Sequence, residues 1–174
     1  MKNLLSVLIV VLFYYSVSGS THSNISGGLS VRFGRGYSTW QPGFNLGFAV
    51  IGKPVDYLGL GGEVSYTRWG QKTVPGVDYD SRSLHFARGM FLFQGCYPLR
   101  GNFILQFEIG EGVAVEMDIK YRDKDADGDV KPLNSMLFGG GVILKYFSMS
   151  LRSNLVFNRP ARTKWISFNL GFYY

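Results

Sequence analysis

Cysteine is nearly absent from this chain of 174 residues: Cys96 stands alone, so no internal disulfide can stabilise the fold. Histidine is as scarce, since His22 and His85 are the two present and neither has metal-ligand spacing to another residue. The net charge is +6, but no basic cluster interleaved with aromatic residues occurs, which argues against a nucleic-acid partner. After the N-terminal segment no stretch repeats apolar residues every 3.6 positions, so helices are not expected.

Glycine and aromatic residues are abundant instead, with 23 glycines and an aromatic content of 16%. Residues 166–174 alternate without a break: Ile166, Phe168, Leu170, Phe172 and Tyr174 share one face, and Ser167, Asn169, Gly171 and Tyr173 share the other. A period of two predicts a β-strand with one apolar face. A terminal strand that ends on an aromatic residue resembles the C-terminal sorting signal of bacterial outer-membrane barrels. This resemblance implies contact with the barrel-assembly machinery through residues 166–174.

Residues 1–20 have the features of a cleaved signal peptide. Lys2 supplies the positive start, residues 4–17 form an apolar run, and small residues follow at 16–20. The run is short for a bilayer-spanning helix, which needs about 20 apolar residues. The alternative is a retained N-terminal anchor. We therefore expect one mature domain over residues 21–174, located in the cell outer membrane.

About eight alternating segments can be counted, and the chemistry of their two faces indicates the class. One face carries Phe, Leu, Val and Ile, whereas the other carries mostly Gly, Ser, Ala and Asn with a few charges. Bulky apolar residues on the outside and small polar ones in the lumen are typical of a barrel in lipid, which must also be closed. The prediction is an all-β, antiparallel up-and-down transmembrane β-barrel of about eight strands. A soluble barrel with the apolar face inward is the alternative.

The segment 83–94 does not alternate cleanly. Strict alternation from Leu84 and Phe86 outward would place Arg88 in lipid, at a cost of about 2–4 kcal/mol near the midplane. A β-bulge near Ala87 would turn Arg88 inward and leave Phe91 and Phe93 outside. The sequence favours that bulge.

Connection lengths predict that the end with the longer loops faces the cell surface and that the end with the short turns faces the periplasm. Short turns are expected near residues 52–56, 96–101 and 146–148, and longer polar loops at 68–82 and 121–132. This topology brings the tryptophans close to the outer interface and several tyrosines close to the inner one, as two aromatic girdles. The residues are Trp40, Trp69 and Trp165 at the outer side and Tyr57, Tyr97, Tyr146, Tyr173 and Tyr174 at the inner side.

Three stretches carry a family resemblance: PGFNLGFAV at 42–50, GGEVSYTRWGQK at 61–72 and FGGGVILKY at 138–146. They resemble the small bacterial outer-membrane β-barrel domain family, which includes PorT-like members and OmpA/OmpX-type eight-stranded barrels. The family usually has a proline where this chain has Ala87 or Arg88. The resemblance implies an outer-membrane location and no agreed activity, so no functional residue is carried over.

The segment 123–134 resembles the start of a calcium loop. Asp123, Asp125, Asp127 and Asp129 surround Gly128, and alternate carboxylates on a tight turn converge on a hard cation. The twelfth position is Asn134 rather than a bidentate Glu, so any Ca²⁺ would bind weakly. The sequence favours a solvated acidic loop, in which Lys124 and Lys131 partly offset the aspartates, with weak Ca²⁺ binding as the alternative, and no cofactor is expected.

Charged residues on the polar faces are candidates for a lumen site. They favour an internal salt-bridge network, because eight strands leave only enough room for side chains and buried charges must be paired. An ion or proton path is the alternative. The residues are Arg32, Glu63, Glu108, Glu116, Lys145 and Arg152, joined by His85 and Arg88 if the bulge forms.

A hydrolytic site is the third possibility, because serine, histidine and aspartate lie close together at 78–85. The residues are Asp78, Asp80, Ser81, Ser83 and His85. Outer loops are commonly rich in serine and aspartate, so the sequence favours no enzyme.

The leading hypothesis is a non-enzymatic structural, adhesive or surface-interaction role through the loops 68–82 and 121–132. Expected partners are outer-membrane lipid and lipopolysaccharide, with a pore or solute carrier as the runner-up and a lipid-modifying enzyme last.

Overall fold

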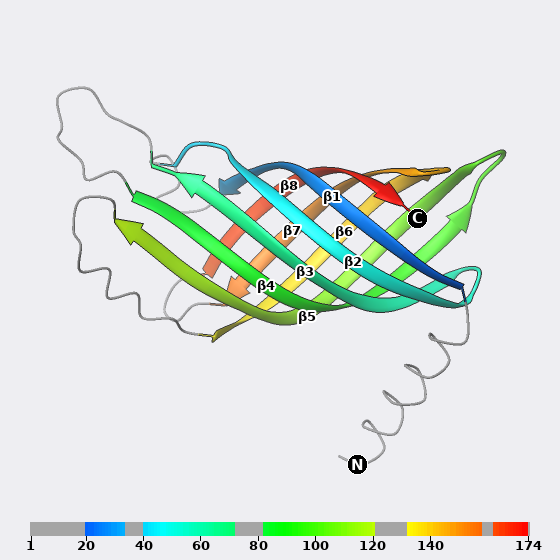
Figure 1. The fold of residues 1–174 in the computed structure, drawn as a ribbon, viewed down its shortest axis with the longest axis horizontal. Helices are drawn as coiled ribbons and strands as arrows, with labels where there is room; N and C mark the ends of the chain where they lie inside the picture. Colours follow the sequence, from blue (N-terminus) through cyan, green and yellow to red (C-terminus); the bar gives the residue numbers. More distant parts are fainter. Residues whose placement is uncertain (1–19, 34–39, 72–81, 121–131, 158–161, 174) are drawn as a thin grey trace, which may run out of the picture.

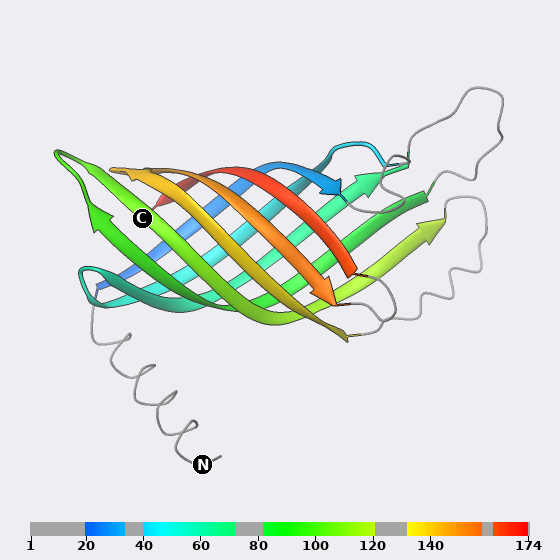
Figure 2. The same cartoon turned by 180° about the vertical axis from the view of Figure 1, so that it is seen from behind.

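Eight antiparallel strands close into one barrel in the computed structural model (Figure 1). The structure describes residues 20–33, 40–71, 82–120, 132–157 and 162–173. Each strand pairs with its neighbour in sequence, and β1 pairs with β8. The view from behind shows β6, β7 and β8 side by side (Figure 2). Among the described residues there is no helix with the length and apolar character needed to cross a membrane. The strands are β1 Ser20–Phe33, β2 Gly43–Val55, β3 Leu58–Gly70, β4 Arg82–Pro98, β5 Phe103–Lys120, β6 Pro132–Leu144, β7 Phe147–Phe157 and β8 Arg162–Tyr173.

The register of the ladders sets the width of the barrel. Following paired residues from Gly27 on β1 leads to Pro132 on β6 in one direction and to Val142 in the other. This offset of ten residues is the shear of the barrel. With eight strands it gives a tilt of about 35–45° and an interior that side chains can fill.

Three short turns lie at one end, which we call the turn end, at residues 56–57, 100–102 and 145–146. Two of them contain a positive φ, at Gly101 (77°) and at Lys145 (53°). The predicted short turns are therefore confirmed. The opposite, loop end carries the connections around 34–39, 72–81, 121–131 and 158–161, which lie outside the described residues.

The outer face is apolar around the whole barrel. Representative side chains are more than two-fifths exposed: Leu29 at 65%, Phe107 at 61%, Val64 at 61% and Leu170 at 54%. The lumen instead holds Asn24, Asn45, Gln94, Asn154 and Asn169, all buried. This polarity is inverted relative to a soluble barrel, so the predicted fold class is confirmed and the soluble alternative does not fit.

Strand β4 contradicts the predicted bulge. Its ladder with β3 runs without interruption from Gly95 to Ser83. Arg88 does point inward, and Phe91 and Phe93 are each 45% exposed outside, as expected. Regular alternation then places Leu84 and Phe86 in the lumen and not on the predicted outer face. No bulge is needed because the lumen near the loop end is apolar.

Candidate functional site: the filled lumen and its loop end

A group of paired charges occupies the middle of the lumen. Glu63 on β3 and Glu108 on β5 both reach Arg152 on β7, and the side chains are 5% exposed or less. Arg152 Nη1 donates to Glu63 Oε2 at 2.7 Å, and its Nε lies 2.8 Å from Glu108 Oε2. Three strands, no two of which are adjacent, are thereby connected across the interior. The predicted salt-bridge network is confirmed for these three residues.

Arg88 extends this network toward the loop end. Its Nη1 donates to Asn154 Oδ1 at 2.7 Å, and Asn154 in turn donates to Ser167 Oγ at 3.1 Å. Arg88 also lies within electrostatic reach of Glu63. Two arginines and two glutamates therefore share one desolvated region with no net charge, which is the condition under which buried ions are tolerated.

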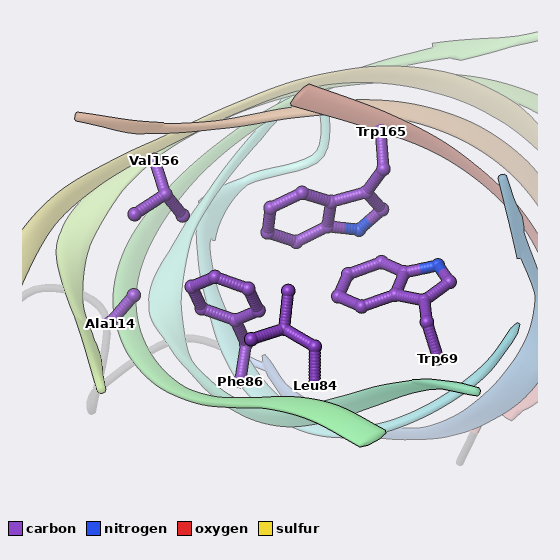
Figure 3. Close-up of a cluster of buried hydrophobic side chains, with 6 residues drawn as sticks. All are labelled: Trp69, Leu84, Phe86, Ala114, Val156 and Trp165. Atoms are coloured by element: carbon purple, nitrogen blue, oxygen red, sulfur yellow. The ribbon is translucent and has the colours of Figure 1, made fainter. Parts of the chain in front are cut away.

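Aromatic residues fill the lumen between the paired charges and the loop end. Trp69 from β3 and Trp165 from β8 meet edge to face at 5.2 Å, and Phe86 from β4 stacks on Trp165 at 5.5 Å. Figure 3 shows these rings converging inside the ring of strands together with Leu84, Ala114 and Val156. We call these six residues the aromatic plug. Trp69, Phe86 and Trp165 have no exposed surface.

Two arginines sandwich the aromatic plug. The Arg32 guanidinium lies 5.5 Å from the Trp69 ring and 4.9 Å from the Trp40 ring, and the Arg88 guanidinium lies 4.9 Å from Trp165. A cation over an aromatic face within about 6 Å is attractive, and the attraction increases when water is excluded. The cations therefore stabilise a closed plug.

The tryptophan girdle expected at the outer interface is wrong, because Trp40 packs against the aromatic plug and the other two tryptophans belong to it. Trp69 and Trp165 lie at the expected end but point into the lumen, and Tyr173 at the turn end is also inside, at 6% exposure. Tyr57, Tyr97 and Tyr146 do face outward at the turn end, each about 60% exposed. The sequence contained the information that these tryptophans point inward. Trp165 falls on the same alternating face as Ser167 and Asn169, and Trp69 falls on the same face as Glu63.

Two predicted lumen residues lie elsewhere. Lys145 sits in the β6–β7 turn and is exposed. His85 pairs with Arg68 in the β3–β4 ladder, on the outer face near the loop end. Its position follows from the absence of the bulge, which would have reversed the parity of this segment. Arg32, in contrast, belongs to the lumen as expected.

His85 and Ser83 form the one predicted hydrolytic pair that the described residues contain. Ser83 Oγ is 2.6 Å from His85 Nε2, and the Tyr66 hydroxyl is hydrogen-bonded to Nδ1. A tyrosine thus occupies the position that an acid takes in a catalytic triad. Ser83 and His85 are 1% and 7% exposed, so no substrate carbonyl reaches Oγ in this conformation. Ser81, Asp78 and Asp80 lie outside the described residues.

The predicted calcium residues Asp123, Asp125, Asp127 and Asp129 also lie outside the described residues. Within the parts of the chain that the structure describes, no three His, Cys, Asp or Glu side chains are grouped so that they could hold a metal ion. Cys96 is a free, buried thiol near the turn end.

One residue missed from the sequence is Glu111. Alternation along β5 places it on the outer face between Ile109 and Val113, which are 52% and 48% exposed. The sequence pattern contained this information, because Glu111 has the parity of the apolar residues around it.

Comparisons with solved structures identify the fold. Neisserial surface protein A matches with a TM-score of 0.61 at 8% identity, covering 88% of this chain and 95% of that one. The attachment invasion locus protein Ail of Yersinia pestis, solved with the heparin analogue sucrose octasulfate, matches with a TM-score of 0.52 at 14% identity, covering 89% and 99%. The fold is thus that of small eight-stranded outer-membrane barrels. No protein-family model matches the sequence, and no curated protein matches it.

Proposed function

We propose that this chain is an integral barrel of a bacterial outer membrane with a non-enzymatic surface-interaction role, carried out through the loops 68–82 and 121–132. The filled lumen carries the proposal. Paired charges at mid-height and the aromatic plug above them leave the interior to the barrel's own side chains. Binding is therefore assigned to the loop end and to the outer face, not to a channel.

The apolar outer face supports the membrane placement. In an aqueous protein, exposed apolar patches seldom exceed a few hundred Å², whereas here apolar side chains surround the barrel. The expected export signal at 1–20 and recognition of β8 by the assembly machinery belong to the same proposal. Sequencing the N-terminus of the membrane-bound protein tests the first point, and assembly of a Phe172→Ala variant tests the second.

Basic residues at the loop end support contact with lipopolysaccharide. Arg68 and Lys164 lie on the outer face, beyond the apolar side chains Tyr66 and Ile166 of their own strands. Cations at this height suit the phosphate groups of an outer leaflet, which they attract as point charges or as bidentate donors. Loop 68–82 contains Arg68, Lys72 and Arg82 against Asp78 and Asp80, for a balance of +1.

A sulfated saccharide is the first ligand to test, because loop 68–82 carries the positive balance and the Ail complex shows that barrels of this fold can hold one. In one variant residues 70–82 are replaced by a short Gly-Ser turn together with Arg68→Gln, which keeps Trp69 of the aromatic plug, and in another the loop 121–132 is replaced. Binding to immobilised heparin is measured in detergent. Folding is checked by the mobility difference between boiled and unboiled samples. We expect binding to fall for the first variant and to persist for the 121–132 replacement. Unchanged binding in both folded variants would refute a loop-based role for this ligand class.

A further inference from the structure

Glu111 places an ionisable group where the barrel is otherwise apolar. It is the ninth of the 18 residues of β5, and its side chain is exposed on the outer face. Its cross-strand neighbours are Phe91 on β4 and Met136 on β6. No hydrogen bond or ion pair joins its carboxyl group to another described residue. In a bilayer this carboxyl group lies near the middle of the hydrocarbon.

A carboxyl group in hydrocarbon is unfavourable without a hydrogen-bonding partner, and no described residue of the barrel supplies one to Glu111. A neutral carboxylic acid can both donate and accept a hydrogen bond. Two such groups therefore satisfy each other completely when they meet face to face. The partner must lie at the same depth, since the bilayer fixes the height of every side chain.

Membrane geometry makes a second copy of this chain the occupant that meets this requirement. In a symmetric dimer of copies inserted in the same direction, the two-fold axis runs along the membrane normal. Every residue close to that axis then meets its own counterpart at its own depth. If the axis passes beside Glu111, the Glu111 side chains of the two copies face each other at the same depth in the membrane.

The surface beside Glu111 is recessed, which allows close approach. A hollow of about 720 Å³ extends over β1 to β5, and Gly89 on β4 and Val113 on β5 line the side of it that lies next to Glu111. A side chain placed at Gly89 would meet no atom within 4 Å, so the space above it is open. Small residues at such sites let membrane segments pack closely.

We propose that two copies of this barrel associate in the membrane through the outer face of β4–β6, with their Glu111 carboxyl groups hydrogen-bonded to each other. The recess beside Gly89 receives apolar side chains of the partner copy. The inference rests on the membrane placement proposed above and is independent of the loop ligand.

Cysteine crosslinking in lipid tests the proposal directly. In a Cys96→Ser background, Glu111→Cys is compared with Leu29→Cys, whose side chain is 65% exposed on β1, four strands away around the barrel. Only residues next to a two-fold axis bring identical Cβ atoms within the roughly 4 Å that a disulfide needs. We expect oxidised dimers for Glu111→Cys and none for Leu29→Cys at equal dilution in bilayers. Equal crosslinking at both positions, or none at Glu111→Cys, would overturn the proposal.

Association without crosslinks provides the second measurement. The dimer fraction of Cys96→Ser protein in lipid is compared with that of Glu111→Gln and Glu111→Leu in the same background. Glu111→Gln keeps a donor and an acceptor and should retain the dimer, whereas Glu111→Leu should weaken it about tenfold, the effect of losing hydrogen bonds in lipid. A dimer equally strong in Glu111→Leu would sink the carboxyl pair. A parent protein that is folded and inserted but monomeric would show that the second copy is the wrong occupant while leaving the membrane placement intact.

Discussion

Removing Arg152 tests whether the central charges are held together as the structure indicates. Arg152→Met keeps the apolar stem and removes the guanidinium that contacts Glu63 at 2.7 Å and Glu108 at 2.8 Å. Two carboxylates then remain in a region with side-chain exposure near 1%. Breaking a buried ion pair by deleting one partner costs about 3–5 kcal/mol. We expect a loss of that size in the free energy of unfolding, measured by urea titration in bilayers with the gel mobility of unboiled samples as readout.

A compensating substitution separates this electrostatic explanation from a simple packing defect. Arg152→Met combined with Glu108→Gln leaves Glu63 opposite Arg88, so the number of charges of each sign is again equal. The double variant should therefore be more stable than Arg152→Met alone, although a second native residue has been removed. A double variant that is less stable than the single one, or a single variant that loses under about 1 kcal/mol, would refute the reasoning.

Three further outcomes are expected. Trp69→Ala with Trp165→Ala opens the aromatic plug, so single-channel conductance in planar bilayers should rise above that of the parent, and a variant as silent as the parent would locate the block elsewhere. Gly28→Ala should destabilise by about 1–3 kcal/mol in urea titration, since its Cβ would lie 1.8 Å from the Phe168 carbonyl oxygen, whereas Gly89→Ala meets no atom and should be neutral. Calcium titration by calorimetry should give no binding heat, as expected for a solvated 123–134 loop, whereas a signal with a Kd of about 1 mM that Asp125→Asn abolishes would show a calcium site there.

The outer face and the closure of the barrel were predictable because they depend on local alternation. In β8 every second residue from Ile166 to Phe172 is 42–54% exposed, as the pattern required. The salt bridges of Arg152 followed from the same pattern, since buried charges need partners and the lumen offered both signs. These features require only knowledge of which way each side chain points.

Strand β4 could not be assigned in this way because it is apolar on both faces. Phe91 and Phe93 lie outside, while Leu84, Phe86 and Leu92 are 5% exposed or less within the lumen. When both faces are apolar, the period of two no longer identifies the inner one. Arg88 was the one residue whose charge indicated which face of β4 points inward. Because a polar lumen was expected, Leu84 and Phe86 were assigned to the outer face, and this assignment required a bulge that the strand does not contain.

How the lumen is filled depends on which residues face one another across it. The shear of the barrel decides these pairs, so they cannot be derived from any single strand. Gly139 on β6 points inward beside Arg152, where an added Cβ would come within 2.9 Å of the arginine Cγ. Gly47 on β2 likewise leaves 3.8 Å between such a Cβ and the Glu63 carboxyl carbon. Small residues on one wall thus provide the volume for large ones on another, which is how interiors reach native packing density. The inward glycines of β2 and β6 and the bulky inward side chains of β3, β4 and β7 are therefore one feature of this barrel, and it becomes visible only when the strands are placed in register.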